Sequence, residues 1–264
     1  MDFTAYQALE FERRGRVLVI RLNRPEQMNA GNAQVHAELS RVFYDANADR
    51  DSDVVVLTGN GRAFCAGGDI GWMQSSVDRP EEFEITAREA KHIVFSQLDL
   101  EKPLICRLNG HATGLGASLA LLSDIIVAHD RVKIGDPHVS VGLVAGDGGA
   151  IIWPQLVGYA KARKYLFTGE LLGAAEAERI GLITEVVPED QLDAASYGLA
   201  ERIAAGATKA IRWTKVTTNL ALKQLFHGYF DAGIAYECMS NATEDHREAV
   251  AAFRERRAPK FTGY

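Results

Sequence analysis

The chain has 264 residues, of which 47% are hydrophobic and 24% are charged. This length is sufficient for one large core, or for a core domain with an appendage. The net charge of -6 and the pI near 5.7 argue against a nucleic-acid partner, because such partners require a basic face. A local basic patch for a phosphorylated ligand remains compatible with this charge.

Three cysteines, Cys65, Cys106 and Cys238, are too few and too scattered for a disulfide framework. No cysteine or histidine spacing indicates a zinc site, so we expect no metal and a reducing compartment. The N-terminal segment contains acidic residues and lacks the apolar region of a signal peptide. No apolar run approaches the roughly 20 residues of a membrane-spanning helix. We therefore expect a cytoplasmic protein without a membrane partner.

The first part of the chain alternates between strand and helix patterns. Two strands are predicted at 6–12 and 16–22, followed by a helix whose N-cap is Asn32. Further elements follow as a buried strand at 54–59, a glycine turn with a short helix within 63–73, a helix at 80–98, and strands at 103–108 and 125–129. This order predicts an α/β fold with a parallel or mixed sheet.

Beyond Asp147 the sequence is mostly helical, with one short strand at 183–187. The periodicity predicts helices at 148–157, 160–168, 174–180, 189–205, 209–219 and 222–239. A basic amphipathic helix in the tail is stopped by Pro259. We therefore divide the chain into a core with the active site at 1–200 and a helical region at 201–264.

Two glycine-rich turns follow predicted strands, AFCAGGDI at 63–70 and GHATGLGAS at 110–118. Each leads into a short helix, where free backbone N–H groups can bind an anion or oxyanion, although either turn alone can be purely structural. Neither has the GK[ST] of a P-loop or the GxGxxG spacing of a dinucleotide fold. Two donors that converge on one oxygen form an oxyanion hole, which suits thioester chemistry.

His138 and Asp147 lie on one loop after the second turn. If this loop folds back, they form a dyad in which the carboxylate orients the imidazole and the imidazole activates water. In the structural alternative, His138 is only a hydrogen-bonding residue and Asp147 caps the next helix. Ser118 lies in a small-residue helix and not in a GxSxG elbow, which argues against a serine hydrolase.

Several basic residues of the tail stand close to Phe261: Arg254, Arg256, Arg257 and Lys260. Such a cluster is compatible with a solvated surface. It is also compatible with a site that holds a phosphate and stacks on an adenine.

Several of these segments together resemble the crotonase superfamily of enoyl-CoA hydratases and isomerases. The resemblance covers nearly the whole chain and is carried by LNRPEQMNA (22–30), VVVLTGNGRAFCAGGDI (54–70), the turn at Asn109–Gly110, SDIIVA (123–128), GLVAGDGG (142–149), YLFTGELLGAAEAERIGLITEVVP (165–188) and the closing RRAPKF. These motifs are specific for the superfamily and much less specific for the reaction.

The resemblance implies a crotonase-like spiral of ββα turns with a C-terminal helical trimerisation region, assembled as a homotrimer or a dimer of trimers. It implies an acyl-CoA substrate, with coenzyme A as part of that substrate and no separate cofactor. The oxyanion hole is then formed by the amides of Gly68 and Leu115, where the family usually has glycine at the second position. Backbone around Ala63, Cys65 and Gly68 is expected to contact the adenine and pantetheine of CoA. Lys260 and Phe261 in the tail are expected to contact the phosphates, including those of a ligand bound by a neighbouring subunit.

The positions of the two hydratase glutamates are occupied here by Ser118 and His138. Asp147 matches the aspartate nucleophile of the 4-chlorobenzoyl-CoA dehalogenase branch. The pattern PHxxxGxxxGDG, with Trp153 and Pro154 soon after, is similar to the 6-oxocamphor hydrolase branch. In that branch a His–Asp pair activates water to cleave a β-diketone. The CAGGDI turn suits a CoA thioester, so the sequence favours a CoA substrate.

Three functions follow from these observations. The first is an acyl-CoA enzyme of the hydratase/isomerase type, with His138 as acid and base and Asp147 as its orienting partner. The second is a hydrolase in which the same pair activates water to cleave a β-dicarbonyl C–C bond or a CoA thioester. The third is a CoA-binding member without catalytic activity. A dehalogenase with Asp147 as nucleophile is a minor variant.

Overall fold

The computed structural model describes residues 2–264, apart from the side chain of Pro80. Its strands are β1 (Leu9–Arg14), β2 (Val17–Leu22), β3 (Val54–Gly59), β4 (Ala63–Cys65), β5 (Leu104–Leu108), β6 (His111–Thr113), β7 (Ile125–His129), β8 (Lys133–Gly135), β9 (Leu172–Gly173) and β10 (Glu185–Val187). Its α-helices are α1 (Ala33–Ala48), α2 (Ile70–Asp78), α3 (Phe83–Asp99), α4 (Leu115–Leu121), α5 (Gly149–Thr168), α6 (Ala174–Arg179), α7 (Leu192–Ala204), α8 (Thr208–Asn241) and α9 (Glu244–Glu255). Short 3-10 helices are η1 (Pro25–Gln27), η2 (Pro80–Glu82), η3 (His138–Val141) and η4 (Glu189–Gln191).

The larger sheet has the strand order β1-β2-β3-β5-β7-β10. β1 and β2 form an antiparallel hairpin, and every other neighbouring pair is parallel. Parallel neighbours require crossovers, and α1, α3 and α4 lie within the connections between them. The predicted mixed α/β architecture is therefore confirmed.

A smaller sheet has the order β4-β6-β8-β9 and forms the floor of the candidate site. β4, β6 and β8 are parallel neighbours, so their carboxyl ends meet at one edge. None of the four strands of this sheet was expected from the sequence, in which β4 and β6 were taken as parts of the two glycine turns. Each strand contains only two or three residues, which is too short for a visible alternation of apolar and polar side chains.

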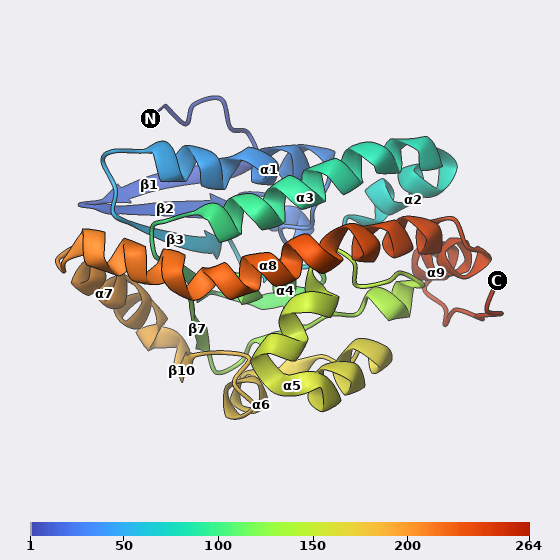
Figure 1. Cartoon of the computed structure of the whole chain (residues 1–264). Coiled ribbons are helices and arrows are strands. Elements are labelled where there is room, and N and C mark those ends of the chain that lie inside the picture. Colours follow the sequence, from blue (N-terminus) through green and yellow to red (C-terminus); the bar gives the residue numbers. More distant parts are fainter. Residues whose placement is uncertain (1) are drawn as a thin grey trace.

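The larger sheet is buried on both faces, as the alternation along β2 shows. Leu18 and Ile20 belong to the main core, whereas Val17 and Val19 face a second cluster that α7 covers. Side chains of a strand point to opposite faces in turn, so both faces require apolar residues. In Figure 1, α1 and α3 lie side by side over the hairpin end of the sheet, and α8 runs across α3.

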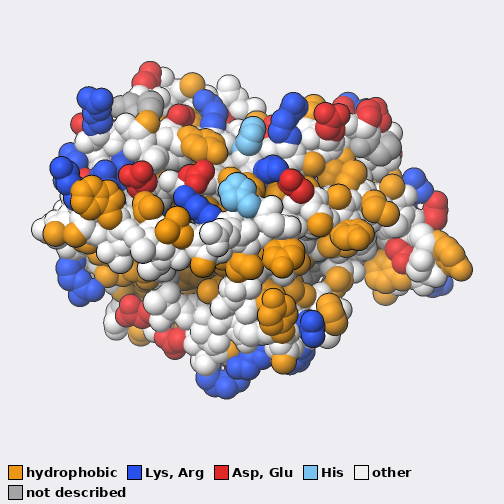
Figure 2. Space-filling view, viewed as in Figure 1, with side chains coloured by type: hydrophobic (Ala, Val, Ile, Leu, Met, Phe, Trp, Pro, Cys, Tyr) orange, Lys and Arg blue, Asp and Glu red, His pale blue; other side chains and the backbone are white. Residues whose placement is uncertain are grey.

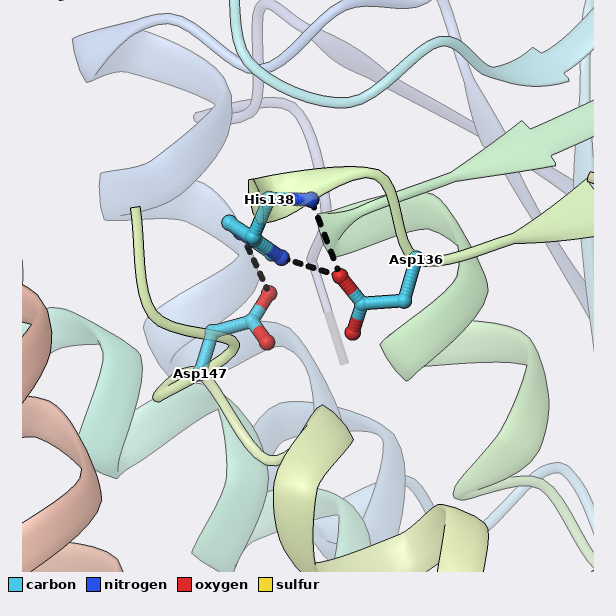
Figure 3. A group of neighbouring side chains, drawn as sticks. All are labelled: Asp136, His138 and Asp147. Atoms are coloured by element: carbon cyan, nitrogen blue, oxygen red, sulfur yellow. Dashed lines mark hydrogen bonds and ion pairs between the residues drawn. The ribbon is translucent and has the colours of Figure 1, made fainter. Parts of the chain in front are cut away.

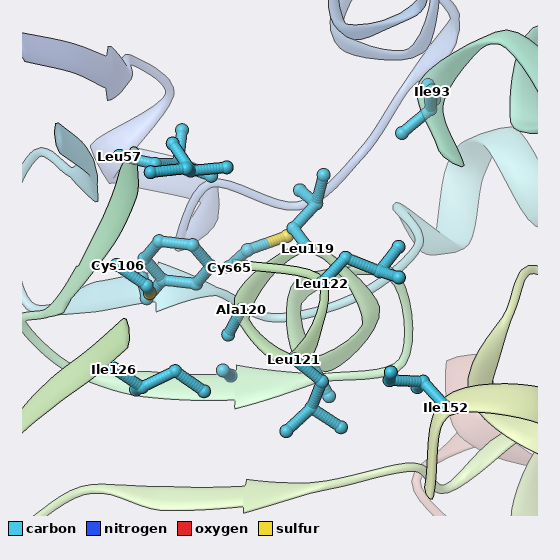
Figure 4. Close-up of a cluster of buried hydrophobic side chains, with 14 of the residues drawn as sticks. Leu57, Cys65, Ile93, Cys106, Leu119, Ala120, Leu121, Leu122, Ile126 and Ile152 are labelled. Carbon is cyan, nitrogen blue, oxygen red and sulfur yellow. The ribbon is translucent and has the colours of Figure 1, made fainter. Parts of the chain in front are cut away.

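Helix α4 lies at the centre of the main core (Figure 4). Its buried leucines and alanines are surrounded by side chains of β3, β5, β7, α3 and α5, among them Leu57, Cys106, Ile126, Ile93 and Ile152. Gly116 in its first turn lies against Cys65 of β4, and a Cβ there would come within 2.4 Å of the Cys65 carbonyl oxygen. Only glycine allows this approach, which holds the start of α4 against β4.

Most predicted helices are found near their expected positions. The Asn32 side chain accepts a hydrogen bond from the Val35 amide, which confirms the predicted N-cap of α1. The two helices expected at 148–157 and 160–168 form α5, which is kinked where Gly158 has φ 75°. The two expected at 209–219 and 222–239 form the single helix α8, because no glycine or proline interrupts the chain between them.

The tail helix α9 ends before Pro259, as expected. Among the described residues, no helix combines the length and apolarity needed to cross a bilayer. The division at residue 200 falls within α7 and stays a prediction.

A pair of glycine substitutions tests the close contact of α4 with β4. Gly116→Ala is expected to destabilise the fold by about 2 kcal/mol or more, because the new methyl group meets a backbone carbonyl in a packed core. Gly198→Ala in α7 has no atom within 4 Å of the new Cβ and is expected to stabilise by about 0.5–1 kcal/mol through helix propensity. Urea denaturation measures both, and equal effects at the two positions contradict the packing argument.

Candidate active site

The two glycine turns predicted from the sequence lie against each other. Each turn follows the carboxyl end of a strand, β4 or β6, and these strands are parallel neighbours. Gly67 and Gly114 both have positive φ, 86° and 52°. A Cβ on Gly114 would lie 3.8 Å from the Cα of Gly67. The turns can pack this closely because neither carries a side chain.

The backbone amides of Gly68 and Leu115 are among those at these turns that have no acceptor within residues 2–264. Gly68 follows the turn after β4, and Leu115 is the first residue of α4, whose Gly114 N-cap offers no side chain. The first amides of a helix have no intrahelical partner and point outward from its end. The pair predicted as an oxyanion hole is thus free to donate to a ligand.

His138 stands beside this amide pair. It begins η3, directly after the third parallel strand β8, and a Cβ on Gly114 would lie 3.5 Å from His138 Cε1 and 3.8 Å from Nε2. Nδ1 of His138 donates a short hydrogen bond to Oδ1 of Asp136. The Asp136 side chain has no exposed surface, and it fixes the ring so that Nε2 faces the turn.

Asp147 approaches the imidazole from the other side (Figure 3). Its Oδ2 lies 3.9 Å from Nε2 of His138, and its Oδ1 accepts a hydrogen bond of 3.0 Å from the Ser118 hydroxyl. The long contact of 3.4 Å with the Gly149 amide is a weak helix cap. The structure therefore brings together His138 and Asp147, which the sequence predicted as a pair on one loop, and adds Ser118 from the second glycine turn.

Two acidic residues of the site were missed in the sequence. Asp136 follows β8, which had no visible signal, although its position two residues before His138 was a usable clue. Glu237 lies in α8, about 90 residues beyond the site loop, and nothing local distinguishes it from other helix glutamates. Both are buried, and Oδ2 of Asp136 and Oε2 of Glu237 have no hydrogen-bond partner among the described residues.

The charges of these groups are strongly coupled. Burial alone would lower the pKa of His138, but the charges of Asp136 and Asp147 outweigh it and hold that pKa well above 6.5. Burial raises the pKa of Asp147, opposed by the His138 charge. Burial raises the pKa of Glu237 to about 8, again opposed by His138 and reinforced by Asp147. These pKa shifts favour an imidazolium at His138 and a protonated carboxyl group at Glu237 at neutral pH.

Two cavities meet at this cluster, and both are lined by Gly68, Met73 and His138. The first, here called the acyl-side cavity, has a volume of about 80 Å³ and also contacts Leu115, Asp147 and Glu237. The second, here called the entry cleft, has about 350 Å³ and runs along the two glycine turns to Phe253 of α9. Gly68 therefore lines both spaces, whereas Leu115 lines the acyl-side cavity alone.

The remaining predicted contacts lie away from these cavities. Ala63 and Cys65 are buried in β4, so their backbone carries any contact with a ligand. Lys260 and Phe261 lie at the exposed tail, where the Lys260 amide donates to Glu248. Neither residue lines the entry cleft of its own chain, and their role toward the phosphates stays a prediction.

Asp136, His138 and Asp147 each offer one metal-ligand atom, and these atoms lie within 4.8 Å of one another. In the described chain, however, Asp136 and His138 are already hydrogen-bonded to each other. The expectation that the site works without a metal stays a prediction.

Comparison with known proteins decides the ancestry. A family model described as enoyl-CoA hydratase/isomerase matches residues 12–264. The chain belongs to the enoyl-CoA hydratase/isomerase family. It is 35% identical to the "Probable enoyl-CoA hydratase" of Mycobacterium bovis, over 97% of this chain and 98% of that protein. The predicted crotonase ancestry is thereby confirmed.

Two solved structures show how the fold is shared within the family. A crystal structure of an enoyl-CoA hydratase/isomerase from Mycobacterium paratuberculosis has a TM-score of 0.89 at 33% identity, and covers 92% of this chain and 97% of that one. A β-diketone hydrolase from the cyanobacterium Anabaena, bound to (S)-3-oxocyclohexyl acetic acid, has a TM-score of 0.84 at 33% identity and covers 91% and 96%. The fold matches the expected crotonase type, and the similarity includes more than one kind of reaction.

The proton on Glu237 predicts how stability depends on pH. Its pKa of about 8 in the folded protein lies above the ordinary value of 4.5, so the folded state holds the proton more tightly. The contribution of this proton to the free energy of unfolding is complete below pH 4.5 and is lost as the pH rises through 8. Relative to Glu237→Gln, the wild type is expected to lose on the order of 3 kcal/mol between pH 5 and 8.

Denaturant unfolding across this pH range measures the loss. Glu248→Gln is the matched control, because hydrogen bonding to Arg257 lowers the Glu248 pKa to about 2, and both its folded and unfolded values lie below the window. A constant difference between wild type and Glu237→Gln from pH 5 to 8 contradicts a buried, protonated Glu237.

Proposed function

We propose that the protein is an acyl-CoA enzyme of the hydratase/isomerase type. The observation that carries this proposal is the contact between two free-amide turns and the imidazole of His138. An acyl oxygen placed between the amides of Gly68 and Leu115 is polarised, and the adjacent carbons then lie beside Nε2. Removing one donor of such a pair typically costs about 3 kcal/mol of transition-state stabilisation.

The geometry divides the work of the missing glutamates between two side chains. Asp136 holds Nδ1, so it takes the orienting role that the sequence analysis gave to Asp147. His138 then presents a proton on Nε2 as a general acid. Asp147 presents a carboxylate whose raised pKa makes it a better general base. An acid and a base side by side are what the addition of water across a double bond requires.

Hydration of an enoyl-CoA takes place in the following steps. Asp147 takes a proton from a water whose oxygen bonds to the β-carbon, and the electrons of the double bond move to the thioester oxygen. The amides of Gly68 and Leu115 stabilise the enolate. His138 then gives its Nε2 proton to the α-carbon, and the proton on Asp147 returns to His138 across 3.9 Å. An isomerase uses the same pair with a proton taken from one carbon and given to another.

A panel of short enoyl-CoA thioesters tests the proposal by turnover and product mass. Wild type is expected to add water or shift the double bond without splitting the molecule. His138→Ala is expected to lower kcat by roughly 100-fold or more. Asp136→Asn is expected to lower kcat by a similar factor, because the amide neither charges nor correctly orients the ring. Asp130→Asn, at an exposed position outside both cavities, is the control.

Two results contradict this mechanism. The first is wild-type turnover that His138→Ala leaves unchanged, which removes the imidazole from the reaction. The second is CoA binding without turnover on any member of the panel, which supports a non-catalytic, CoA-binding protein.

A hydrolase is the second candidate, favoured by the similarity to the β-diketone hydrolase structure. In that reaction, water activated by Asp147 and His138 attacks a carbonyl carbon. The C–C bond to the neighbouring carbon breaks, and His138 protonates the enolate that leaves. Product mass separates the candidates for CoA thioesters and open-chain diketones, because hydrolysis splits such a substrate into an acid and a second fragment, with free thiol released when a thioester is cleaved. A cyclic diketone gains one water in a single product, and a new carboxylic acid then identifies hydrolysis.

We also propose that the chain assembles as a homotrimer or a dimer of trimers, through α8 among other elements. Large apolar side chains remain exposed along this helix, at Trp213, Leu220, Tyr229, Tyr236 and Met239. Figure 2 shows hydrophobic side chains gathered on the face that α8 crosses. Exposed apolar area of this extent is typical of an interface. Sedimentation equilibrium is expected to give a mass of three or six chains, and a monomer at micromolar concentration contradicts the proposal.

A further inference from the structure

A histidine outside the reacting cluster lines the acyl-side cavity. His246 lies in the first turn of α9 and has no exposed surface. Its backbone amide donates to the side chain of the N-cap residue Thr243. A Cβ on Gly142 would lie only 2.9 Å from this backbone nitrogen of His246. The backbone of His246 is therefore packed closely against the loop that carries His138.

The hydrogen bonding of His246 fixes which nitrogen carries its proton. Nδ1 lies 2.7 Å from the carbonyl oxygen of Val141, and a carbonyl can only accept, so Nδ1 carries the hydrogen. Burial lowers the pKa of His246 below 6.5 and outweighs the hydrogen bond to Val141, which raises it, so the neutral ring is favoured at pH 7. Nε2 is consequently a lone-pair acceptor, and it has no partner within residues 2–264.

A buried acceptor without a donor is unfavourable and rare in folded proteins. Other polar side chains share the cavity, at His36, Ser76, Thr86 and Asn241. A cavity shaped only for a hydrocarbon chain has no need of these groups.

The cavity volume of about 80 Å³ is roughly half that of an engineered cavity that holds benzene. The acyl group that fits is therefore short.

We propose that the acyl-side cavity selects a short acyl group bearing a hydroxyl, or an equivalent O–H or N–H donor, which donates to Nε2 of His246. This inference rests on the proposed function in taking the group to be attached to CoA. The hydroxyl lies at the end of the acyl chain away from the thioester. His138 and Val141 both belong to η3, so one element positions the reacting imidazole and the imidazole that recognises the substrate.

Three unreactive CoA thioethers test this without turnover, by calorimetry on the full chain. S-(4-hydroxybutyl)-CoA carries the donor, S-butyl-CoA lacks it, and S-(4-methoxybutyl)-CoA keeps the oxygen without the hydrogen. Wild type is expected to bind the hydroxyl compound roughly 10- to 100-fold more tightly than the other two. His246→Phe is expected to abolish this preference and leave the affinity for S-butyl-CoA within about threefold.

A second variant and a spectroscopic measurement keep the result independent of folding defects. His246→Gln retains an acceptor near Nε2 and is expected to retain part of the preference. In ¹⁵N-histidine spectra, the signal of the unprotonated Nε2 is expected to shift when the hydroxyl compound binds and not when the butyl compound binds. His92→Ala, at an exposed position of α3 outside the cavity, is the control for both.

Each possible result has a distinct meaning. Equal affinities for the hydroxyl and butyl compounds in wild type, or a preference that survives His246→Phe, overturn the inference and leave the proposed function intact. Failure of all three thioethers to bind wild type overturns the acyl-CoA assignment itself, and the inference with it.

Discussion

The site depends on one buried contact, the hydrogen bond from Nδ1 of His138 to the carboxylate of Asp136. Asp136 lies at the carboxyl end of β8 and has no exposed side-chain surface. A Cβ on Gly149 would lie 2.0 Å from its second oxygen, so the glycine at the start of α5 makes room for the carboxylate. The contact keeps Nε2 beside the glycine turns and, together with Asp147, keeps the ring charged.

The arrangement of charges follows from burial. Three carboxyl groups and one imidazole share a space that water scarcely reaches, and such groups cannot all be ionised at once. The imidazolium balances one carboxylate, and a proton on Glu237 removes another charge. The result is a charged imidazole beside a carboxyl group at the edge of a small cavity.

Much of the fold could be predicted from local sequence, for identifiable reasons. The two glycine turns follow buried strands. Because their proposed function rests on backbone amides, the glycines alone were enough to identify them in the sequence. The Asn32 cap and the helices beyond Asp147 follow from capping chemistry and periodicity. The continuous helix α8 was predicted as two helices, although no glycine or proline lies between residues 219 and 222.

The site was predicted less completely because its parts meet only through tertiary structure. His138 and Asp147 share a loop and were proposed as a pair, which agrees with their distance of 3.9 Å. Asp136 follows a strand of only three residues, and Glu237 comes from a helix remote in sequence. His246 shows its chemistry only through the partner of its Nδ1. No periodicity or spacing in one sequence reports which buried atoms are left without a hydrogen bond.

The protonation state of His138 is the most direct test of this account. ¹⁵N spectra of histidine-labelled protein, assigned with His138→Ala, report whether each ring nitrogen is protonated as the pH is varied. The account predicts that both nitrogens of His138 carry hydrogen at pH 7, because two aspartates hold the charge in place. A neutral His138 ring at pH 7, titrating near 6.5 like an exposed histidine, would contradict the central claim.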